Sequence, residues 1–115
     1  MNAEQLPLYK KAYDLHLRLF QITKNYQKEY KHNLAFRLIE HSLEILLLIY
    51  KSNSSVNNKE YRREMIELII EELKKVQILS RISFDLKLIN EERYAELIEI
   101  TNNINKQSIG WRNNC

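Results

Sequence analysis

Residues 34–51 read LAFRLIEHSLEILLLIYK, and this stretch decides the fold. One set of its residues recurs at the spacing that lines one side of an α-helix: Leu34, Leu38, Ile45 and Leu48. From Ile45 to Tyr50 every residue is apolar, which predicts a helix that is buried on all sides. Because a helix in a monomeric bundle normally keeps one side in water, the run also predicts a subunit interface.

The rest of the chain contains few residues that interrupt helices. Only one of the 115 residues is glycine and only one is proline, so the sequence has little means of forming the tight hairpin turns of a β-sheet. Nucleotide-binding loops need several glycines close together, and this sequence excludes them. Leu, Ile, Glu, Lys and Arg dominate the remainder and favour helices. The composition therefore predicts a small all-α protein.

Apolar periodicity extends outward from this central stretch over the whole chain. We expect a single domain covering residues 1–115, folded as an up-down four-helix bundle. The four helices are expected at residues 6–24, 31–51, 58–87 and 90–110. The expected buried side of the third helix consists of Met65, Ile69, Leu73, Val76, Leu79, Ile82 and Leu86.

Capping and turn residues mark the breaks between these helices. Residues 52–58 favour turns over helix interiors, and Asn57 with Glu60 resembles a capping box for the third helix. Asn90 is the expected N-cap of the fourth helix. Trp111, which follows the only glycine, is expected to pack against the bundle because a large aromatic contributes heavily to a small core.

The sequence contains no pattern typical of a catalytic or metal site. The three histidines, His16, His32 and His41, are not spaced as two ligands on one helical face. Glu40 directly precedes His41, whereas di-iron bundles use two Glu-x-x-His motifs, and the chain contains only one, at Glu29 and His32. The position of His41 on the apolar seam indicates a hydrogen-bonded structural residue. We therefore expect a protein that has no catalytic activity and binds neither a metal nor a cofactor.

The sequence lacks the features of membrane and secreted proteins. It has no apolar run of about 20 residues, the length that a membrane span needs, and its first residues do not resemble a secretory leader. Its only cysteine is Cys115, so no internal disulfide can form. We expect a cytoplasmic protein with no membrane partner.

Cations shared by helical faces indicate an anionic partner. The net charge is +3, and Arg63, Lys74 and Arg81 share one face of the third helix because their spacings are close to whole numbers of turns. A similar face on the first helix carries Lys11 and Arg18, next to Lys10. A phosphate backbone requires cations rather than a particular fold. The alternative is a solvated face on which nearby carboxylates pair with these cations: Glu67, Glu71 and Asp85.

Four motifs together resemble a known family over nearly the whole chain. They are LPLYKKAYDL at 6–15, LAFRLIE at 34–40, LSRISFDLK at 79–87 and IGW at 109–111. Their order is similar to that of small bacterial four-helix-bundle proteins. This family includes the accessory variability determinant of diversity-generating retroelements and the proteins encoded in ribosomal-RNA intervening sequences.

The resemblance implies a homopentameric barrel and an accessory role. The expected function is non-catalytic binding of RNA, DNA or both, together with a reverse transcriptase, during mutagenic retrohoming. The candidate nucleic-acid-binding residues are the six cations Lys10, Lys11, Arg18, Arg63, Lys74 and Arg81. The alternative is an oligomeric structural or interaction bundle of the ribosomal intervening-sequence type.

Overall fold

The computed structural model describes residues 1–115, and all of its regular structure is helical. Four long helices dominate, and short helical turns precede the first and second of them. In chain order the elements are η1 (Ala3–Gln5), α1 (Pro7–Thr23), α2 (Lys28–Tyr30), η2 (Lys31–Ala35), α3 (Phe36–Ser54), α4 (Lys59–Asp85) and α5 (Glu91–Asn113).

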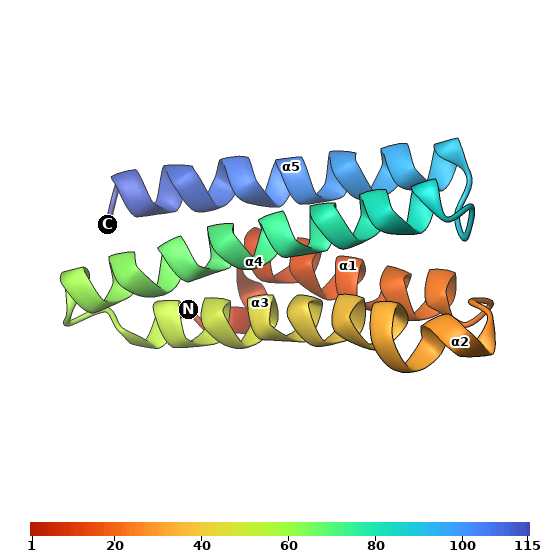
Figure 1. Ribbon diagram of the computed structural model, residues 1–115. Coiled ribbons are helices and arrows are strands. Elements are labelled where there is room, and N and C mark those ends of the chain that lie inside the picture. The colour runs from red at the N-terminus through yellow and green to blue at the C-terminus, as the bar shows by residue number, and fades with distance from the viewer.

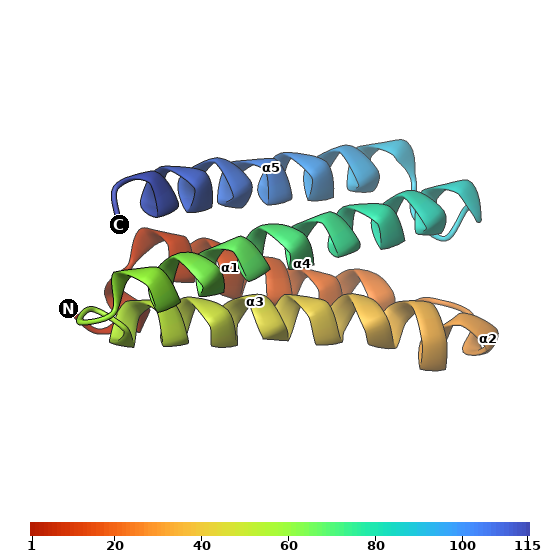
Figure 2. The same ribbon diagram turned by 60° about the vertical axis from the view of Figure 1, so that its left-hand side comes forward.

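The four long helices form an elongated bundle of 45 × 22 × 21 Å, in which successive helices run in opposite directions (Figures 1 and 2). Helix α3 packs beside α1 and α4, and α5 closes the bundle by packing beside α4 and α1. Helices α1 and α4 are therefore diagonal neighbours, as are α3 and α5. This arrangement confirms the predicted all-α class and the packing of four helices into a bundle.

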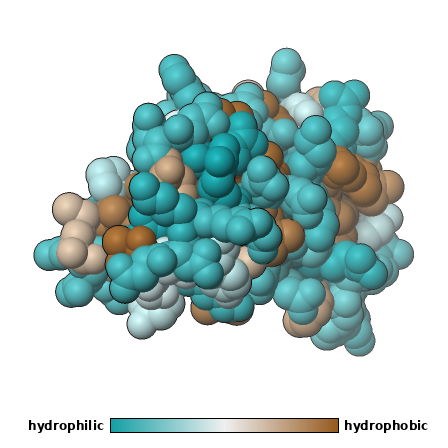
Figure 3. Space-filling model, turned by 90° about the vertical axis from the view of Figure 1, so that its left-hand side faces the viewer, coloured by the Kyte–Doolittle hydropathy of each residue, from teal (hydrophilic) through white to brown (hydrophobic).

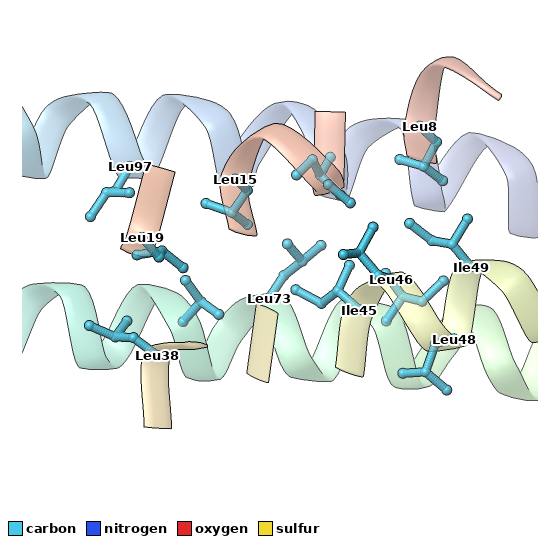
Figure 4. Close-up of a cluster of buried hydrophobic side chains, with 14 of the residues drawn as sticks. Leu8, Leu15, Leu19, Leu38, Ile45, Leu46, Leu48, Ile49, Leu73 and Leu97 are labelled. Atoms are coloured by element: carbon cyan, nitrogen blue, oxygen red, sulfur yellow. The ribbon is translucent and has the colours of Figure 1, made fainter. Parts of the chain in front are cut away.

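Aliphatic side chains from all four long helices meet along the bundle axis (Figure 4). Leu15 and Leu19 of α1 lie opposite Leu38 and Ile45 of α3, and each of the four has no exposed surface. Leu73 of α4 and Leu97 of α5 complete the core in the same view. Burial of these side chains supplies the main driving force for folding, roughly 1.5–3 kcal/mol for each large aliphatic group.

The prediction that Ile45–Tyr50 is buried on all sides is wrong for the single chain. Ile45 and Ile49 have no exposed surface, whereas Leu47 is 46% exposed and Tyr50 is 57% exposed. Among the long helices, α3 packs mainly against α1 and α4, so the side of α3 that points away from both remains exposed.

The predicted buried side of α4 is correct in its middle and wrong at its C-terminal end. Ile69, Leu73 and Val76 are buried, but Ile82 and Leu86 are 42% and 45% exposed. The inward positions there belong to two small residues, Ser80 and Ser83. Each hydroxyl donates a hydrogen bond to the carbonyl four residues earlier, so these polar groups are buried without loss of hydrogen bonding.

The helix boundaries follow capping residues more closely than apolar periodicity. Asn90 caps α5 as predicted, with its side chain accepting a hydrogen bond from the Arg93 N–H. The cap of α4 is Asn58 rather than Asn57, because Asn58 accepts from the Tyr61 N–H. Helix α3 continues to Ser54, so the loop expected at residues 52–58 begins later than predicted.

The chain reverses after α4 without a glycine. Lys87 adopts a left-handed conformation, with φ of 63°. The Lys87 and Leu88 N–H groups donate to the carbonyls of Phe84 and Ser83, which is the hydrogen-bond pattern of a Schellman motif. This turn brings α5 back along α4.

The prediction that Trp111 packs against the bundle is confirmed. The indole is partly buried against the hydrophobic core, and the Arg62 guanidinium lies 5.6 Å from its ring centroid. Arg62 also donates to the Ser52 and Asn53 carbonyls at the end of α3. Trp111 and Arg62 thereby tie the C-terminal turns of α5 to the start of α4 and the end of α3.

Candidate nucleic-acid interface

The three candidate cations of α4 are exposed and lie on the side of this helix that turns toward α5. Two contacts define that side. The Arg81 guanidinium lies 5.7 Å from the ring centroid of Tyr94 in α5, and Gln77 donates to Thr101 and Asn102 in α5. We call the surface formed by Arg63, Lys74, Arg81 and the adjoining side of α5 the α4/α5 face.

An aromatic pair holds Arg81 in place. The rings of Phe84 and Tyr94 stack with centroids 5.0 Å apart and an angle of 11° between their planes. The guanidinium lies 5.6 Å from the Phe84 centroid, and its Nε lies 3.2 Å from the Asp85 carboxylate. The Tyr94 hydroxyl and Asp85 both raise the pKa of Arg81. The charge is therefore fixed in position while the side chain remains 58% exposed.

One of the three cations forms a salt bridge with a carboxylate of the alternative interpretation. Asp85 pairs with Arg81, whereas neither Arg63 nor Lys74 forms a salt bridge. Glu67 and Glu71 are exposed and form no salt bridge with them. Arg63 and Lys74 are therefore not held by salt bridges, and Glu67 and Glu71 lie within one helical turn of them.

The candidate cations of α1 lie elsewhere and are less available. Arg18 forms a two-pronged contact with the Glu96 carboxylate of α5 and also donates to Gln21. Lys11 lines a depression that also contains the carboxylates of Asp14, Glu96 and Glu99. These positions border the α1/α5 groove, on the opposite side of α5 from α4.

The structure therefore does not gather the six candidate cations on one surface. Lys10 is exposed and adjacent to Lys11 in sequence, but a helix turns about 100° per residue, so the two point in different directions. The α4 cations form one line, and the α1 cations form another that is separated from it by α5. In the α4 line, two cations form no salt bridge and the third lies over an aromatic pair.

Sequence reasoning did not single out the outward side of α5, a shallow and open surface lined by residues of this helix alone. It begins at Tyr94, the ring that stacks on Phe84. Ala95 and Ile98 supply apolar surface, and Asn102 and Asn103 supply amides. No pattern in the sequence distinguishes this side of α5 from an ordinary solvated surface, because Asn and Gln are mostly exposed in proteins.

The opposite side of the bundle exposes apolar groups instead. We call it the α1/α3 face; the bond from His16 Nδ1 to Ser42 Oγ marks the seam between its two helices. Its large apolar side chains are between 43% and 57% exposed: Tyr13, Leu17 and Phe20 of α1 with Phe36, Leu43, Leu47 and Tyr50 of α3. Tyr13 stacks on Tyr9, and Phe20 meets His16 edge to face.

A second exposed apolar strip runs along α4. It consists of Tyr61, Leu68, Ile78, Ile82 and Leu86. Viewed along the bundle, the surface is largely hydrophilic, with apolar groups in several separate patches (Figure 3). Large apolar side chains that gather on one face, as on the α1/α3 face, mark an interaction site more often than scattered single residues do.

The histidines take part in contacts between helices. The prediction of a hydrogen-bonded structural role for His41 is confirmed, since its Nδ1 contacts the Glu72 carboxylate, which Lys75 also contacts. The Ser42 hydroxyl donates to the Ile39 carbonyl, so it accepts from His16 at 2.7 Å. Burial lowers the pKa of His16.

No group of three or more His, Cys, Asp or Glu side chains is arranged to hold a metal ion. None of the helices combines the length and the apolar character needed to cross a membrane.

Comparison with known proteins provides no relative. No family model, curated protein or solved structure matches the chain significantly.

Proposed function

We propose that this protein is a non-catalytic accessory factor that binds nucleic acid through its α4/α5 face and acts together with a reverse transcriptase in a diversity-generating retroelement. The observation that carries the nucleic-acid part is the line of exposed cations on α4, two of them without a salt bridge. Cations in a row along a helix suit a phosphate backbone, which is a row of negative charges. The proposed partnership with a reverse transcriptase is supported by the motif resemblance alone.

The proposed assembly is a cytoplasmic homopentameric ring. Each chain exposes two different apolar strips, one on the α1/α3 face and one on α4. When one surface of a subunit packs on a different surface of the next, the contact is heterologous and closes into a ring if the rotation permits. A ring also repeats the α4 cations in every subunit, so a modest charge per chain becomes a strong electrostatic site.

The second candidate function is an oligomeric interaction bundle of the ribosomal intervening-sequence type. The specific observation in its favour is that seven large apolar side chains are exposed on the α1/α3 face, whereas the α1 cations face carboxylates. In this alternative the protein assembles but does not bind nucleic acid. A reverse-transcriptase gene with template and variable repeats beside the coding sequence supports the first function, and an insertion within a ribosomal-RNA gene supports the second.

The decisive experiment is fluorescence anisotropy with labelled RNA and DNA across a salt series. Wild-type protein should bind both with little sequence preference, and log K should fall linearly with log salt, by about 0.9 for each duplex phosphate neutralised. The double variant Arg63→Glu/Lys74→Glu should lose at least tenfold in affinity while keeping its helical content. Its matched control is Lys28→Glu/Lys31→Glu, which makes the same charge change on α2 and η2.

Two results would contradict this proposal. If the wild-type protein binds neither RNA nor DNA at low salt, the interaction bundle is the better account. If both double variants weaken binding equally, net charge rather than the α4/α5 face determines affinity.

A further inference from the structure

A small pocket lies at the end of the bundle where α4 turns into α5, on the right in Figure 1. Three separate parts of the chain form its walls: the C-terminal end of α1 with the residues after it, the turn between α4 and α5, and the first turn of α5. Its volume is about 210 Å³, and Ile22, Leu88 and Ile89 supply its apolar surface. Because its walls come from three segments, a ligand there would be contacted from more than one side. We call it the end pocket.

The charged groups that line the end pocket are two guanidiniums, those of Arg18 and Arg93. One carboxylate contacts both of them: Glu96 pairs closely with Arg18 and lies 3.8 Å from Arg93. Two positive charges therefore share one negative charge, which leaves an excess of positive charge. Glu91 and Glu92 are close in sequence but do not line the pocket. The electrostatics of the end pocket therefore favour an anion.

The amides of the end pocket are left as hydrogen-bond donors. The Gln21 side-chain oxygen accepts from Arg18 at 3.1 Å, and the Asn90 side-chain oxygen accepts from the Arg93 main-chain N–H at 2.8 Å. Because both oxygens are occupied, the NH₂ group of each amide remains. Asn25 adds a third amide from the turn after α1. A ligand that matches this set of groups must supply several acceptors.

Arg18 is held in position before any ligand binds. Its Nε and Nη2 atoms donate to Glu96, and its Nη1 atom donates to Gln21. A guanidinium has five N–H groups, so some of those of Arg18 remain without a partner in the chain. Donors that are already fixed lose little conformational freedom on binding. Arg93 is more exposed and has only the longer contact with Glu96, so its charge is the less constrained of the two.

We propose that the end pocket binds a terminal phosphate group, carried by a nucleotide or by the end of a nucleic-acid strand. A terminal phosphate carries up to two negative charges and three acceptor oxygens that point in different directions, whereas a carboxylate has one charge and two oxygens in a plane. Donors on facing walls therefore suit the phosphate better, and guanidinium forks pair well with its oxygens. The proposal does not depend on the α4/α5 face, because other residues line the end pocket.

The test compares two thymidine dinucleotides that carry fluorescein at the 3′ end and either a phosphate or a hydroxyl at the 5′ end. At constant ionic strength, anisotropy should show that the 5′-phosphate form binds about tenfold more tightly, as expected from one added charge-assisted hydrogen bond. AMP and inorganic phosphate are then added as competitors. If both displace the probe, the pocket recognises the phosphate group itself; if only AMP does, it recognises a nucleotide; if neither does, it recognises the end of a strand.

Variants locate this preference in the end pocket. Arg93→Gln should abolish the preference for the 5′-phosphate, whereas Arg93→Lys should keep part of it because the charge is retained. The matched control is Lys106→Gln, which removes the same charge at an exposed position further along α5 and should leave the preference unchanged. Asn25→Asp places a carboxylate in the pocket from an exposed turn and should also abolish the preference. Unchanged helical content by circular dichroism confirms that the variants fold.

Three results would overturn the phosphate site. The first is equal binding of the two dinucleotides by the wild type, and the second is an unchanged preference in Asn25→Asp. The third is an equal loss of preference in Arg93→Gln and Lys106→Gln, because net charge rather than the pocket would then determine affinity. None of these results bears on the proposed nucleic-acid function, which is tested separately at Arg63 and Lys74 of α4.

Discussion

The helices of this bundle contribute similar aliphatic side chains to the core, but the α1/α3 and α4/α5 faces expose different kinds of residue. On the α1/α3 face, rings and leucines such as Phe20 and Leu47 remain about half exposed. On the α4/α5 face, amides form hydrogen bonds between the helices, and Arg81 lies over an aromatic pair. The α1/α3 face therefore resembles a protein–protein interface without its partner, whereas the α4/α5 face suits a polar, charged partner.

This difference shows that core packing leaves the function of a bundle open. Each long helix needs only one apolar side to join the core, so its remaining surface is free to carry a second property. A solvated surface does not require large apolar groups on α3, and it does not require two unpaired cations in a line on α4. The following predictions test whether the two faces act separately.

The largest expected effect concerns assembly. Leu43→Glu/Leu47→Glu places two charges on the α1/α3 face and should convert an assembly of about five chains into monomers, because burial of unpaired charge is costly. Size exclusion with light scattering measures the mass. The control Ala95→Glu/Asn103→Glu adds the same charges on α5 and should leave the oligomer intact. A wild-type protein that is monomeric at micromolar concentration contradicts the assembly.

The next effect separates core from surface within α3. Ile45→Ala should cost about 2–5 kcal/mol of unfolding free energy, because Ile45 has no exposed surface and its truncation leaves a cavity. Leu47→Ala, two residues away and half exposed, should cost about 0.5 kcal/mol or less in dilute solution. Chemical denaturation measures both. An equal loss at the two positions would show that the α1/α3 face is covered within the single chain.

A smaller effect is expected where α4 meets α5. Gln77→Ala removes two hydrogen bonds between these helices and should cost about 1 kcal/mol in thermal or chemical unfolding. Gln107→Ala removes only a bond to Asn103 within α5 and is the matched control, with a smaller cost. If the two variants are equally stable, the amides do not hold the helices together.

The smallest expected effect is a pH dependence of stability that arises from His16 at the α1/α3 seam. Burial lowers the pKa of His16 below its usual value of 6.5, so the unfolded chain binds the proton more tightly than the folded one. Stability should therefore be full above about pH 6.5 and fall as the pH decreases through the folded pKa. Melting temperatures measured from pH 7.5 to 5 should decline more for the wild type than for His16→Gln. Parallel curves would assign the decline to other groups.

Local features of the fold were predictable because their causes are local. The Asn90 cap depends on a side chain and an N–H three residues away, and the scarcity of glycine and proline excluded sheet turns. The same reasoning was wrong by one residue at Asn58, since neighbouring asparagines are equivalent in sequence. It was also wrong at Ile82 and Leu86, where the small Ser80 and Ser83 take the inward positions.

The candidate site was less predictable because its contacts join distant parts of the chain. Arg18 and Glu96 are 78 residues apart, so no pattern near Arg18 indicates that its charge is engaged. Phe84 and Tyr94 stack only because the turn through Lys87 returns α5 along α4. The availability of Lys74 likewise depends on where the carboxylates of α4 and α5 lie after folding.

The sequence by itself determined that the chain forms helices, approximately where they begin and end, and which residues could enter a core. Helical hydrogen bonds and caps act over about four residues, so sequence is sufficient for these features. The tertiary structure alone decided which apolar side chains of α3 remain outside and which cations remain unpaired. Burial and ion pairing depend on the positions of neighbouring helices, which the chain acquires only when the bundle closes.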